Sequence, residues 1–291
     1  MVAYKTRWKH YVELWFDEPD PAEDDDADVV VRRRALKPDR RAQIEEFHSL
    51  QIDLLQSPES IHARFTRNTR AQIRRSTESD DLQFDFFDHP TAAQTDEFIA
   101  FYDAFALSKG LAPLSADYAD AHRRSGHFSL TRVRRGDEDL VWHANVSSGS
   151  YIGLAYSASQ LRSAEQEARR LIGRANRRLH WEELLRFRAQ GHRCYDFGGW
   201  YEGRSDPERL SINRFKEEFG GKKVVLFASI ENRTFVAKLS AALRSFVPRR
   251  SLVQPRSAGS SNGSSVEPRP KTSALSLPNS RTVVTTAKSR S

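Results

Sequence analysis

Hydrophobic and polar residues alternate with a period of two in several short segments, which predicts β-strands. Leu82, Phe84 and Phe86, for example, are separated by the polar residues Gln83 and Asp85. Short apolar runs bounded by turn residues give the same prediction elsewhere. The predicted strands cover residues 47–54, 82–87, 128–134, 140–146, 151–156, 193–197 and 223–230.

Other segments carry apolar residues three and four positions apart, which predicts helices. Phe98, Phe101, Tyr102 and Phe105 follow this spacing. The predicted helices cover residues 58–76, 93–109, 115–125, 163–190, 207–219 and 235–246, with Ser57 and Asp206 as N-caps of the first and the fifth. From residue 82 onward the predicted order is β, α, α, β, β, β, α, β, α, β.

The amino-acid composition bears on the size of the core and on the compartment in which the protein is expected. Of the 291 residues, 38% are hydrophobic, which is enough for a substantial core. Cys194 is the only cysteine, so an intramolecular disulfide is excluded and a reducing, cytoplasmic location is expected. Because no apolar stretch approaches about 20 residues, we expect no membrane span, and residues 1–16 do not resemble a secretion signal.

The net charge of +7 arises in the last part of the chain. Residues 247–291 carry eight basic side chains and one acidic side chain, whereas the rest of the chain is balanced. This segment is rich in Ser, Pro, Arg and Thr, which predicts a disordered tail. The tail could bind anionic surfaces weakly or serve only as a solubilising segment. Residues 17–27 form an acidic segment that predicts a loop.

Four motifs stand in order between residues 47 and 230. The first is a basic run from Arg64 to Arg75, and the second runs from Ile172 to Trp181. The third is Tyr-Asp-Phe-Gly-Gly at 195–199, and the fourth is Phe-Lys-Glu-Glu-Phe-Gly-Gly at 215–221. Paired glycines after a strand let a ligand approach the backbone closely.

Together these motifs resemble the FemA/FemB-like group of the GNAT acyltransferase superfamily. The resemblance implies an α/β fold (an α+β mixed sheet) whose central strands splay apart. It divides the chain into a partial N-terminal lobe at 1–81 with the basic helix 58–76, a GNAT-like domain at 82–246, and the tail at 247–291. The acyl donor is then expected in the cleft between residues 151–156 and 193–197.

The group includes peptidoglycan-bridge aminoacyltransferases, which use aminoacyl-tRNA, and proteins assigned as acyl-CoA-dependent transferases of cell-surface polysaccharide pathways. The resemblance therefore implies transfer of an acyl group to an amine of a saccharide or peptide precursor of the cell envelope. Since this chain offers one complete domain and no helical arm, acetyl-CoA or another acyl-CoA is the preferred donor. Aminoacyl-tRNA is the alternative donor. The alternative to an enzyme is a non-catalytic binding module that holds an anionic polymer.

Donor binding is predicted for two sets of residues. Arg170, Gly173 and Ala175 fit the GNAT phosphate loop, whose backbone N–H groups bind a pyrophosphate at a helix start. If the helix begins at Ser163 instead, Gly173 lies inside it and only packs closely. Gly198 and Gly199 are the second set, because glycines leave room for the donor.

Substrate binding is predicted for Arg67, Arg70 and Arg74, which share one face of the basic helix. Asn176 and Trp200 complete this set by the resemblance. Guanidinium groups bind phosphates well, so the partner would be a nucleotide, coenzyme A or a tRNA backbone. The alternative is a solvated surface helix.

Catalysis is predicted for Lys216 and Asp196. The resemblance gives Lys216 contact with the substrate or the developing oxyanion. Asp196 would orient the amine or act as a general base, or alternatively pair with an arginine. His180 is interpreted as a core or boundary histidine and Cys194 as structural. With scattered histidines and one cysteine, no metal site is predicted.

Overall fold

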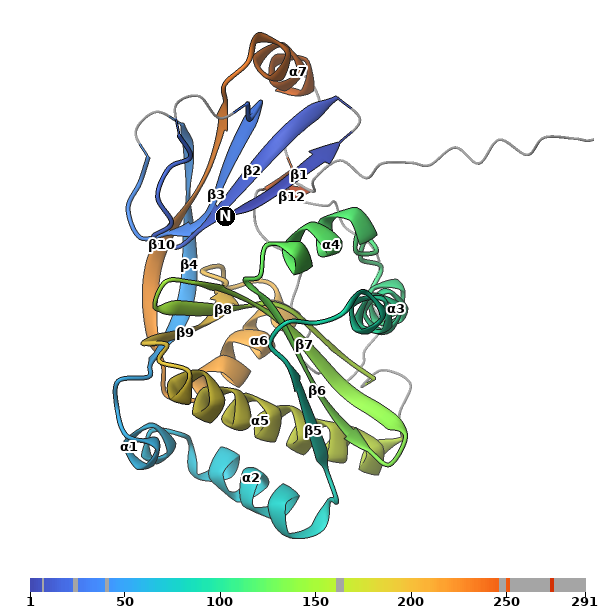
Figure 1. Ribbon diagram of the computed structural model, residues 1–291. Helices are drawn as coiled ribbons and strands as arrows, with labels where there is room; N and C mark the ends of the chain where they lie inside the picture. Colours follow the sequence, from blue (N-terminus) through green and yellow to red (C-terminus); the bar gives the residue numbers. More distant parts are fainter. Residues whose placement is uncertain are drawn as a thin grey trace, which may run out of the picture.

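Figure 1 shows a computed structural model of the chain. The structure describes residues 1–6, 8–22, 26–39, 42–160 and 165–245, with only the backbone for 242–245, 250–251 and 273–274. Ten strands of the described part form one mixed sheet in the order β1-β2-β3-β10-β4-β9-β8-β7-β6-β5. They are β1 (Val2–Thr6), β2 (Lys9–Trp15), β3 (Val29–Ala35), β4 (Gln43–Asp53), β5 (Gln83–Phe87), β6 (Phe128–Arg135), β7 (Glu138–Ser148), β8 (Tyr151–Ser159), β9 (Cys194–Gly199) and β10 (Lys222–Asn232). The two-residue strands β11 (Arg250–Ser251) and β12 (Ser273–Ala274) pair separately.

Seven helices are described, and they agree with the predicted segments except in one place. They are α1 (Pro58–Ala63), α2 (Arg67–Ser79), α3 (Ala92–Ser108), α4 (Ala116–Arg124), α5 (Gln166–Ala189), α6 (Pro207–Glu217) and α7 (Phe235–Ser245). The helix predicted at 58–76 is two helices, because Thr66 adopts extended backbone angles and its side chain caps α2 through the N–H of Thr69 (3.2 Å). The predicted N-caps Ser57 and Asp206 are confirmed.

The helices cover both faces of the sheet (Figure 1). On one face, α3 packs against β7 and β8 around Phe98, Tyr102 and Trp142, all of which are buried. On the other face, α5 packs against β6 and β7 through Leu171 and Leu179, with α2 outside it. The sheet is therefore buried at its centre, between two helical layers.

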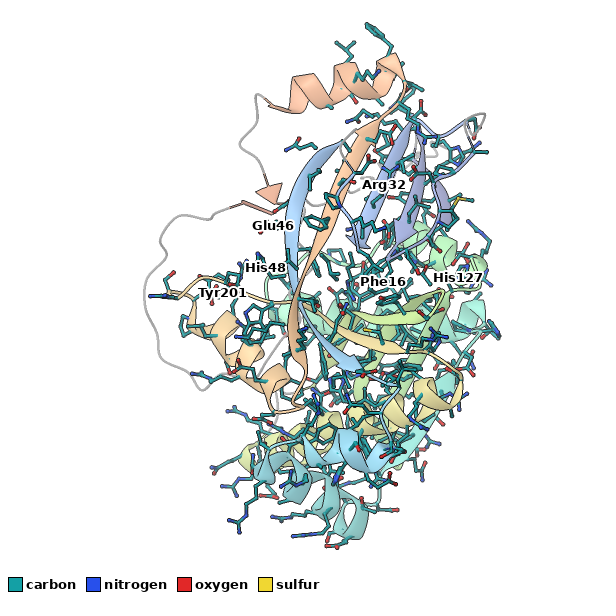
Figure 2. The ribbon with its side chains drawn as sticks, turned by 90° about the vertical axis from the view of Figure 1, so that its left-hand side faces the viewer. Phe16, Arg32, Glu46, His48, His127 and Tyr201 are labelled. Carbon is teal, nitrogen blue, oxygen red and sulfur yellow. The ribbon has the colours of Figure 1, made fainter. Side chains whose placement is uncertain are left out.

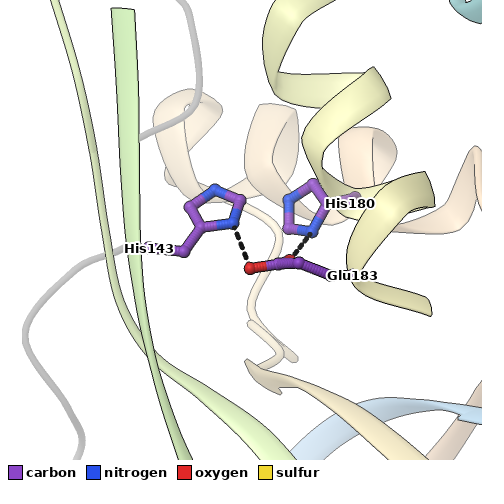
Figure 3. A group of neighbouring side chains, drawn as sticks. All are labelled: His143, His180 and Glu183. Carbon is purple, nitrogen blue, oxygen red and sulfur yellow. Dashed lines mark hydrogen bonds and ion pairs between the residues drawn. The ribbon is translucent and has the colours of Figure 1, made fainter. Parts of the chain in front are cut away.

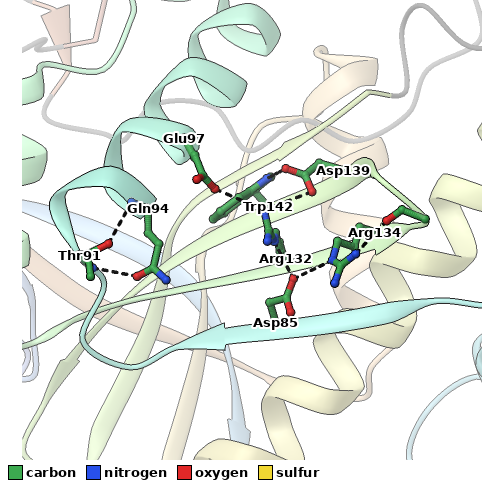
Figure 4. A network of polar contacts seen from close by, with 9 residues as sticks. Asp85, Thr91, Gln94, Glu97, Arg132, Arg134, Asp139 and Trp142 are labelled. Carbon is green, nitrogen blue, oxygen red and sulfur yellow. Dashed lines mark hydrogen bonds and ion pairs between the residues drawn. The ribbon is translucent and has the colours of Figure 1, made fainter.

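The outer strand β5 is fixed by side chains as well as by its pairing with β6 (Figure 4). Asp85 accepts hydrogen bonds from Arg132 (2.7 Å) and Arg134 (3.0 Å). Helix α3 begins just beyond this strand with a capping box between Thr91 and Gln94.

The central strands β8 and β9 separate after three paired positions. They run parallel, and the last pair is Gly153 with Asp196. Beyond it, the buried guanidinium of Arg34 lies between the strands, donating to the Leu154 carbonyl (2.6 Å) and to Asp196 (2.9 Å). A Cβ on Gly153 would lie 2.3 Å from Nη1 of Arg34, so only glycine leaves room for it. The predicted mixed sheet with splayed central strands is confirmed.

Strands β1, β2 and β3 were not anticipated by the periodicity of the sequence, and they extend the sheet beyond β10. Because β10 pairs with both β3 and β4, the parts 1–81 and 82–246 share one sheet. Their division into two domains stays a prediction. Residues 23–25 of the predicted acidic loop and nearly all of the predicted tail lie outside the described residues. None of the described helices combines the length and apolarity needed to cross a membrane.

Candidate functional site

A cavity of about 760 Å³ lies where β8 and β9 separate. Leu154 of β8 and Phe197 of β9, the first residues beyond the paired positions, both line it. Helices α2, α5 and α6 supply the remaining walls. The cavity thus lies between the two strands to which the sequence assigns the acyl donor.

Basic side chains dominate the walls of this cavity. The lining arginines are Arg75, Arg169, Arg170, Arg174, Arg177 and Arg214. Lys216 joins them, whereas Glu218 is the single lining carboxylate. Arg174 is held by Asp80 (2.6 and 2.8 Å) and Arg177 by Glu218 (2.8 Å). Most of the positive charge is therefore not balanced within the cavity lining.

Two of these arginines are available for a ligand. Within the described part of the chain, neither Arg75 of α2 nor Arg214 of α6 forms an ion pair. Guanidinium groups bind phosphate oxygens through paired, charge-assisted hydrogen bonds. The cavity consequently suits a ligand with several negative charges.

Lys216 reaches the cavity from α6 and is almost fully buried. Its Nζ donates to the carbonyl oxygens of Gly198 (3.0 Å) and Gly199 (2.6 Å). Burial lowers the pKa of Lys216 to about 7, with a further contribution from Arg34 and an opposing one from Asp196. An ammonium group has three donors, and its contacts with described residues use two of them. The third remains for a ligand.

Asp196 is a buried carboxylate that pairs with Arg34, and its role in catalysis stays a prediction. It is fully buried and does not line the cavity. It accepts hydrogen bonds from Arg34 (2.9 Å), Ser49 (2.8 Å), Gln51 (2.9 Å) and the backbone N–H of Gly198 (2.8 Å). Four donors occupy its oxygens, so it anchors the Arg34 guanidinium, as the alternative from the sequence had it.

Gly198 and Gly199 lie behind the cavity and do not line it, contrary to their prediction as donor-binding residues. Gly198 has a φ of +74°, a conformation that side chains disfavour. This backbone turn directs the carbonyl oxygens of both glycines to the Lys216 ammonium. The glycine pair therefore positions the lysine.

The phosphate loop predicted at Arg170, Gly173 and Ala175 is not a helix start. Helix α5 begins at Gln166, and the N–H of Arg169 already donates to the Glu165 carbonyl (2.8 Å). Later N–H groups are bonded inside the helix, so they cannot bind a pyrophosphate. The predicted loop is wrong because the residues before Arg170 are themselves helical. Arg170 and Gly173 still line the cavity, whereas Ala175 is fully buried.

The basic helix meets the cavity with a different face from the one predicted. The residues of α2 that line the cavity are Asn68, Ala71, Gln72 and Arg75. The predicted substrate-binding residues Arg67, Arg70 and Arg74 do not line it. Arg70 instead donates to the carbonyls of Ala63 (2.9 Å) and Phe65. At the end of the basic run, Arg75 lines the cavity and Arg74 does not, so the substrate-binding role of Arg67, Arg70 and Arg74 stays a prediction.

The remaining predicted residues, Asn176 and Trp200, are separated by the structure. Asn176 lines the cavity from α5. Trp200 lies outside it, where its backbone N–H donates to the His48 carbonyl (2.7 Å) and the Lys223 ammonium lies over its indole ring. His48 and the neighbouring Tyr201 mark this position in Figure 2. The substrate-binding role of Trp200 therefore has no support from the cavity and stays a prediction.

Next to Lys216 lies a buried network that sequence reasoning missed, made of His143, His180 and Glu183 (Figure 3). Nδ1 of His143 is 3.0 Å from Oε1 of Glu183, and Nδ1 of His180 is 3.3 Å from Oε2. Nδ1 of His180 also lies 3.1 Å from the Tyr195 hydroxyl. His180 lines the cavity, whereas Glu183 lies behind it. The i, i+3 spacing of His180 and Glu183 was the only sequence signal.

Glu183 accepts further hydrogen bonds from Thr131 (2.5 Å), Asn145 (3.1 Å) and Tyr195 (3.1 Å). Burial alone would raise its pKa, but the neighbouring histidines and donors hold the pKa well below its usual value. The three groups His143, His180 and Glu183 lie close enough to hold a metal ion. Because donors already surround the carboxylate, the arrangement fits a hydrogen-bonded anion better than a metal ligand.

Comparisons with known proteins bear on this fold. Protein-family models give no match to the sequence, and curated proteins give none. Among solved structures, the crystal structure of FemX superposes with a TM-score of 0.52 at 14% identity, over 69% of this chain and 63% of that one. The chain therefore shares the fold of FemX, in agreement with the FemA/FemB-like fold that the sequence predicts.

Two further structures share parts of this arrangement at lower similarity. The C-terminal domain of a putative lysylphosphatidylglycerol synthetase from Agrobacterium fabrum gives a TM-score of 0.47 at 12% identity, over 78% of this chain and 73% of that one. A putative GNAT-family acetyltransferase from Novosphingobium aromaticivorans gives 0.37 at 12% identity, over 71% and 74%. The chain spans less than two thirds of FemX, so FemX supports the fold and not a particular reaction.

Proposed function

We propose that this protein is an acyltransferase that moves an acyl group from an acyl-CoA to an amine inside the arginine-lined cavity. One observation carries the proposal: a buried lysine with a free N–H donor lies in a cavity that has seven basic side chains and one carboxylate. The transferase-type fold supports the same reading. The phosphates of coenzyme A supply the negative charge that Arg75 and Arg214 would bind.

The chemistry follows from the position of Lys216. The amine nitrogen attacks the thioester carbonyl, and the C=O electrons move to the oxygen. The remaining N–H of Lys216 donates to this oxyanion, which stabilises it most where water is excluded. Collapse of the intermediate breaks the C–S bond and releases coenzyme A. An amine of a saccharide or peptide precursor is the acceptor class that the sequence resemblance suggests.

The test is a calorimetric titration of the full chain with acetyl-CoA. We expect micromolar binding, and binding about 10-fold to 150-fold weaker by Arg75→Gln, because a charge-assisted contact contributes about 1.5–3 kcal/mol. Arg74→Gln is the matched control, since Arg74 is adjacent in sequence but exposed off the cavity. Equal losses in both variants, or none in either, would contradict the assignment of Arg75.

Catalysis is tested by thiol release from acetyl-CoA in the presence of amino sugars or peptides with free amino groups. Lys216→Met should lower the rate at least about 100-fold without changing acetyl-CoA affinity. If the protein bound aminoacyl-tRNA and not acetyl-CoA, aminoacyl-tRNA would become the proposed acyl donor. Binding of both without any transfer would favour the module that holds an anionic polymer.

A further inference from the structure

His180 occupies a position in the cavity that the proposed function leaves unused. It lies one helical turn beyond Asn176 on α5, and both residues line the cavity together with Lys216. Its ring is otherwise enclosed by the aromatic side chains of Phe197, Phe215 and Phe219. An imidazole on the wall of such a cavity can exchange a proton with a bound group.

The hydrogen bonds at Nδ1 decide what the other ring nitrogen can do. Tyr195 has one hydroxyl proton, and both His180 Nδ1 and Glu183 Oε2 lie 3.1 Å from its oxygen. If Tyr195 donated to His180, Oε2 of the buried Glu183 would lose both of its donors. Burying an unpaired carboxylate oxygen is costly, so Tyr195 donates to Glu183 and His180 carries its proton on Nδ1. This tautomer is assigned from the hydrogen-bond pattern.

With Nδ1 protonated, Nε2 of His180 is the ring atom with a lone pair. We propose that His180 accepts the proton of the attacking amine at Nε2, with Glu183 as the residue that fixes its tautomer and orientation. The inference rests on the proposed function and adds the destination of a proton that Lys216 cannot take while it is charged. Glu183 and His143 are less suited to this step, because His180 is the member of the described network that lines the cavity.

The proton balance is then complete. Attack forms the C–N bond and leaves a positive charge on nitrogen and a negative charge on oxygen. The nitrogen gives one proton to Nε2 of His180, and the intermediate collapses with loss of the thiolate. The imidazolium returns the proton to that thiolate, so His180 ends neutral and the enzyme regains the charge state in which it began.

The charged and titratable groups around His180 favour a neutral imidazole ring before the reaction. Glu183 lies on its own helix, His143 on β7, Tyr195 on β9 and Lys216 on α6. Burial, together with the charges of His143 and Lys216, lowers the pKa of His180 to about 4 despite Glu183. The ring therefore enters the reaction able to accept a proton at neutral pH.

The direct test needs no substrate. Histidine side chains in the ¹⁵N-labelled full chain are observed by long-range ¹H–¹⁵N NMR, and His180 is assigned from the signal lost in His180→Gln. The expected result is an Nδ1-protonated ring that stays neutral between pH 5 and pH 8. An Nε2-protonated ring would overturn the proposal, because the cavity would then face a donor. If His180→Gln fails to fold, Tyr195→Phe should leave the tautomer unchanged, and a switch to Nε2–H would contradict the inference.

Kinetics supply the second test and separate this inference from the proposed function. His180→Gln should lower kcat at least about 100-fold with unchanged acetyl-CoA affinity, whereas His89→Gln, at an exposed histidine, should match the wild type. Full kcat in His180→Gln, together with a loss of kcat in Lys216→Met, would contradict the role of His180 as proton acceptor. The proposed acyltransferase function would be unaffected by that result. Absence of transfer by the wild type as well as by every variant would contradict the proposed acyltransferase function. The NMR result would still decide the tautomer of His180.

Discussion

At the scale of single residues, this protein places charged groups in unusual surroundings and uses backbone atoms to hold them. Lys216 is buried against two glycine carbonyls, and Arg34 is buried against Asp196. Burial disfavours a charge unless polar partners replace water. The described hydrogen-bond partners of Lys216 are neutral carbonyl groups, and burial lowers the pKa of this lysine to about 7.

Stability should therefore depend on pH through Lys216. The folded pKa of about 7 lies below the ordinary value of 10.5, so between these values the unfolded chain binds more protons than the folded one. Unfolding free energy then rises with pH through this window, and the penalty is complete below pH 7. Between pH 7 and pH 9 the wild type should gain about 2 kcal/mol more than Lys216→Met, measured by urea unfolding.

Lys222→Met is the control, because Lys222 is exposed on β10 and should leave the pH dependence unchanged. Parallel curves for the wild type and Lys216→Met would show that the lysine keeps its ordinary pKa in the folded protein. The assignment of Lys216 as a lysine poised near neutrality would then be withdrawn.

At the scale of elements, two glycines with similar sequence surroundings have opposite roles. Gly153 lies on β8, where a Cβ would meet Arg34 at 2.3 Å and Phe16 at 2.8 Å. Gly173 lies inside α5, where the nearest atom to a Cβ is Nη1 of Arg177 at 3.5 Å. Gly153 leaves the room that Arg34 needs between β8 and β9. Gly173 has no such role, and a side chain at its position would favour the helix.

Alanine at these two positions should change stability in opposite directions. Gly153→Ala is expected to lower the unfolding free energy by about 1–3 kcal/mol, because the new methyl group would displace the Arg34 guanidinium from between β8 and β9. Gly173→Ala is expected to raise it by up to about 1 kcal/mol through helix propensity. Urea unfolding of both variants decides the matter. Destabilisation by Gly173→Ala would mean that this glycine serves the site or its packing after all.

At the scale of the whole molecule, one sheet joins the N-terminal strands to the rest of the fold. Strand β10 lies between β3 and β4, and β4 lies between β10 and β9. The strand that carries Gly198 and Gly199 is therefore supported by residues far earlier in the chain. The fold also gathers positive charge, because residues from α2, α5 and α6 meet in one cavity although residues 1–246 are balanced in charge.

A fragment that begins at residue 82 should consequently fail to fold. Removing residues 1–81 takes β4 from between β9 and β10 and exposes the backbone groups of both strands. Circular dichroism during urea titration should show a single cooperative transition for the full chain and none for residues 82–291. A cooperative transition in the fragment would instead support two domains divided at residue 81.

The sequence by itself determined the elements and the presence of a site. Alternation, helical spacing and caps located most strands and helices from residue 47 onward, because these signals depend on near neighbours. They failed for β1 to β3, where buried charged residues such as Glu13 and Arg32 break the alternation. The motifs also pointed to Lys216 and Asn176, and both residues line the cavity.

Only the tertiary structure decided which groups meet. The role of Asp196 depends on Arg34, which is 162 residues away, and the choice of Arg75 over Arg74 depends on how α2 rotates against α5. The network around Glu183 joins β6, β7, β9 and α5, which share no local pattern. Charges and hydrogen bonds act over a few ångströms in space, and sequence spacing does not encode such distances across a sheet.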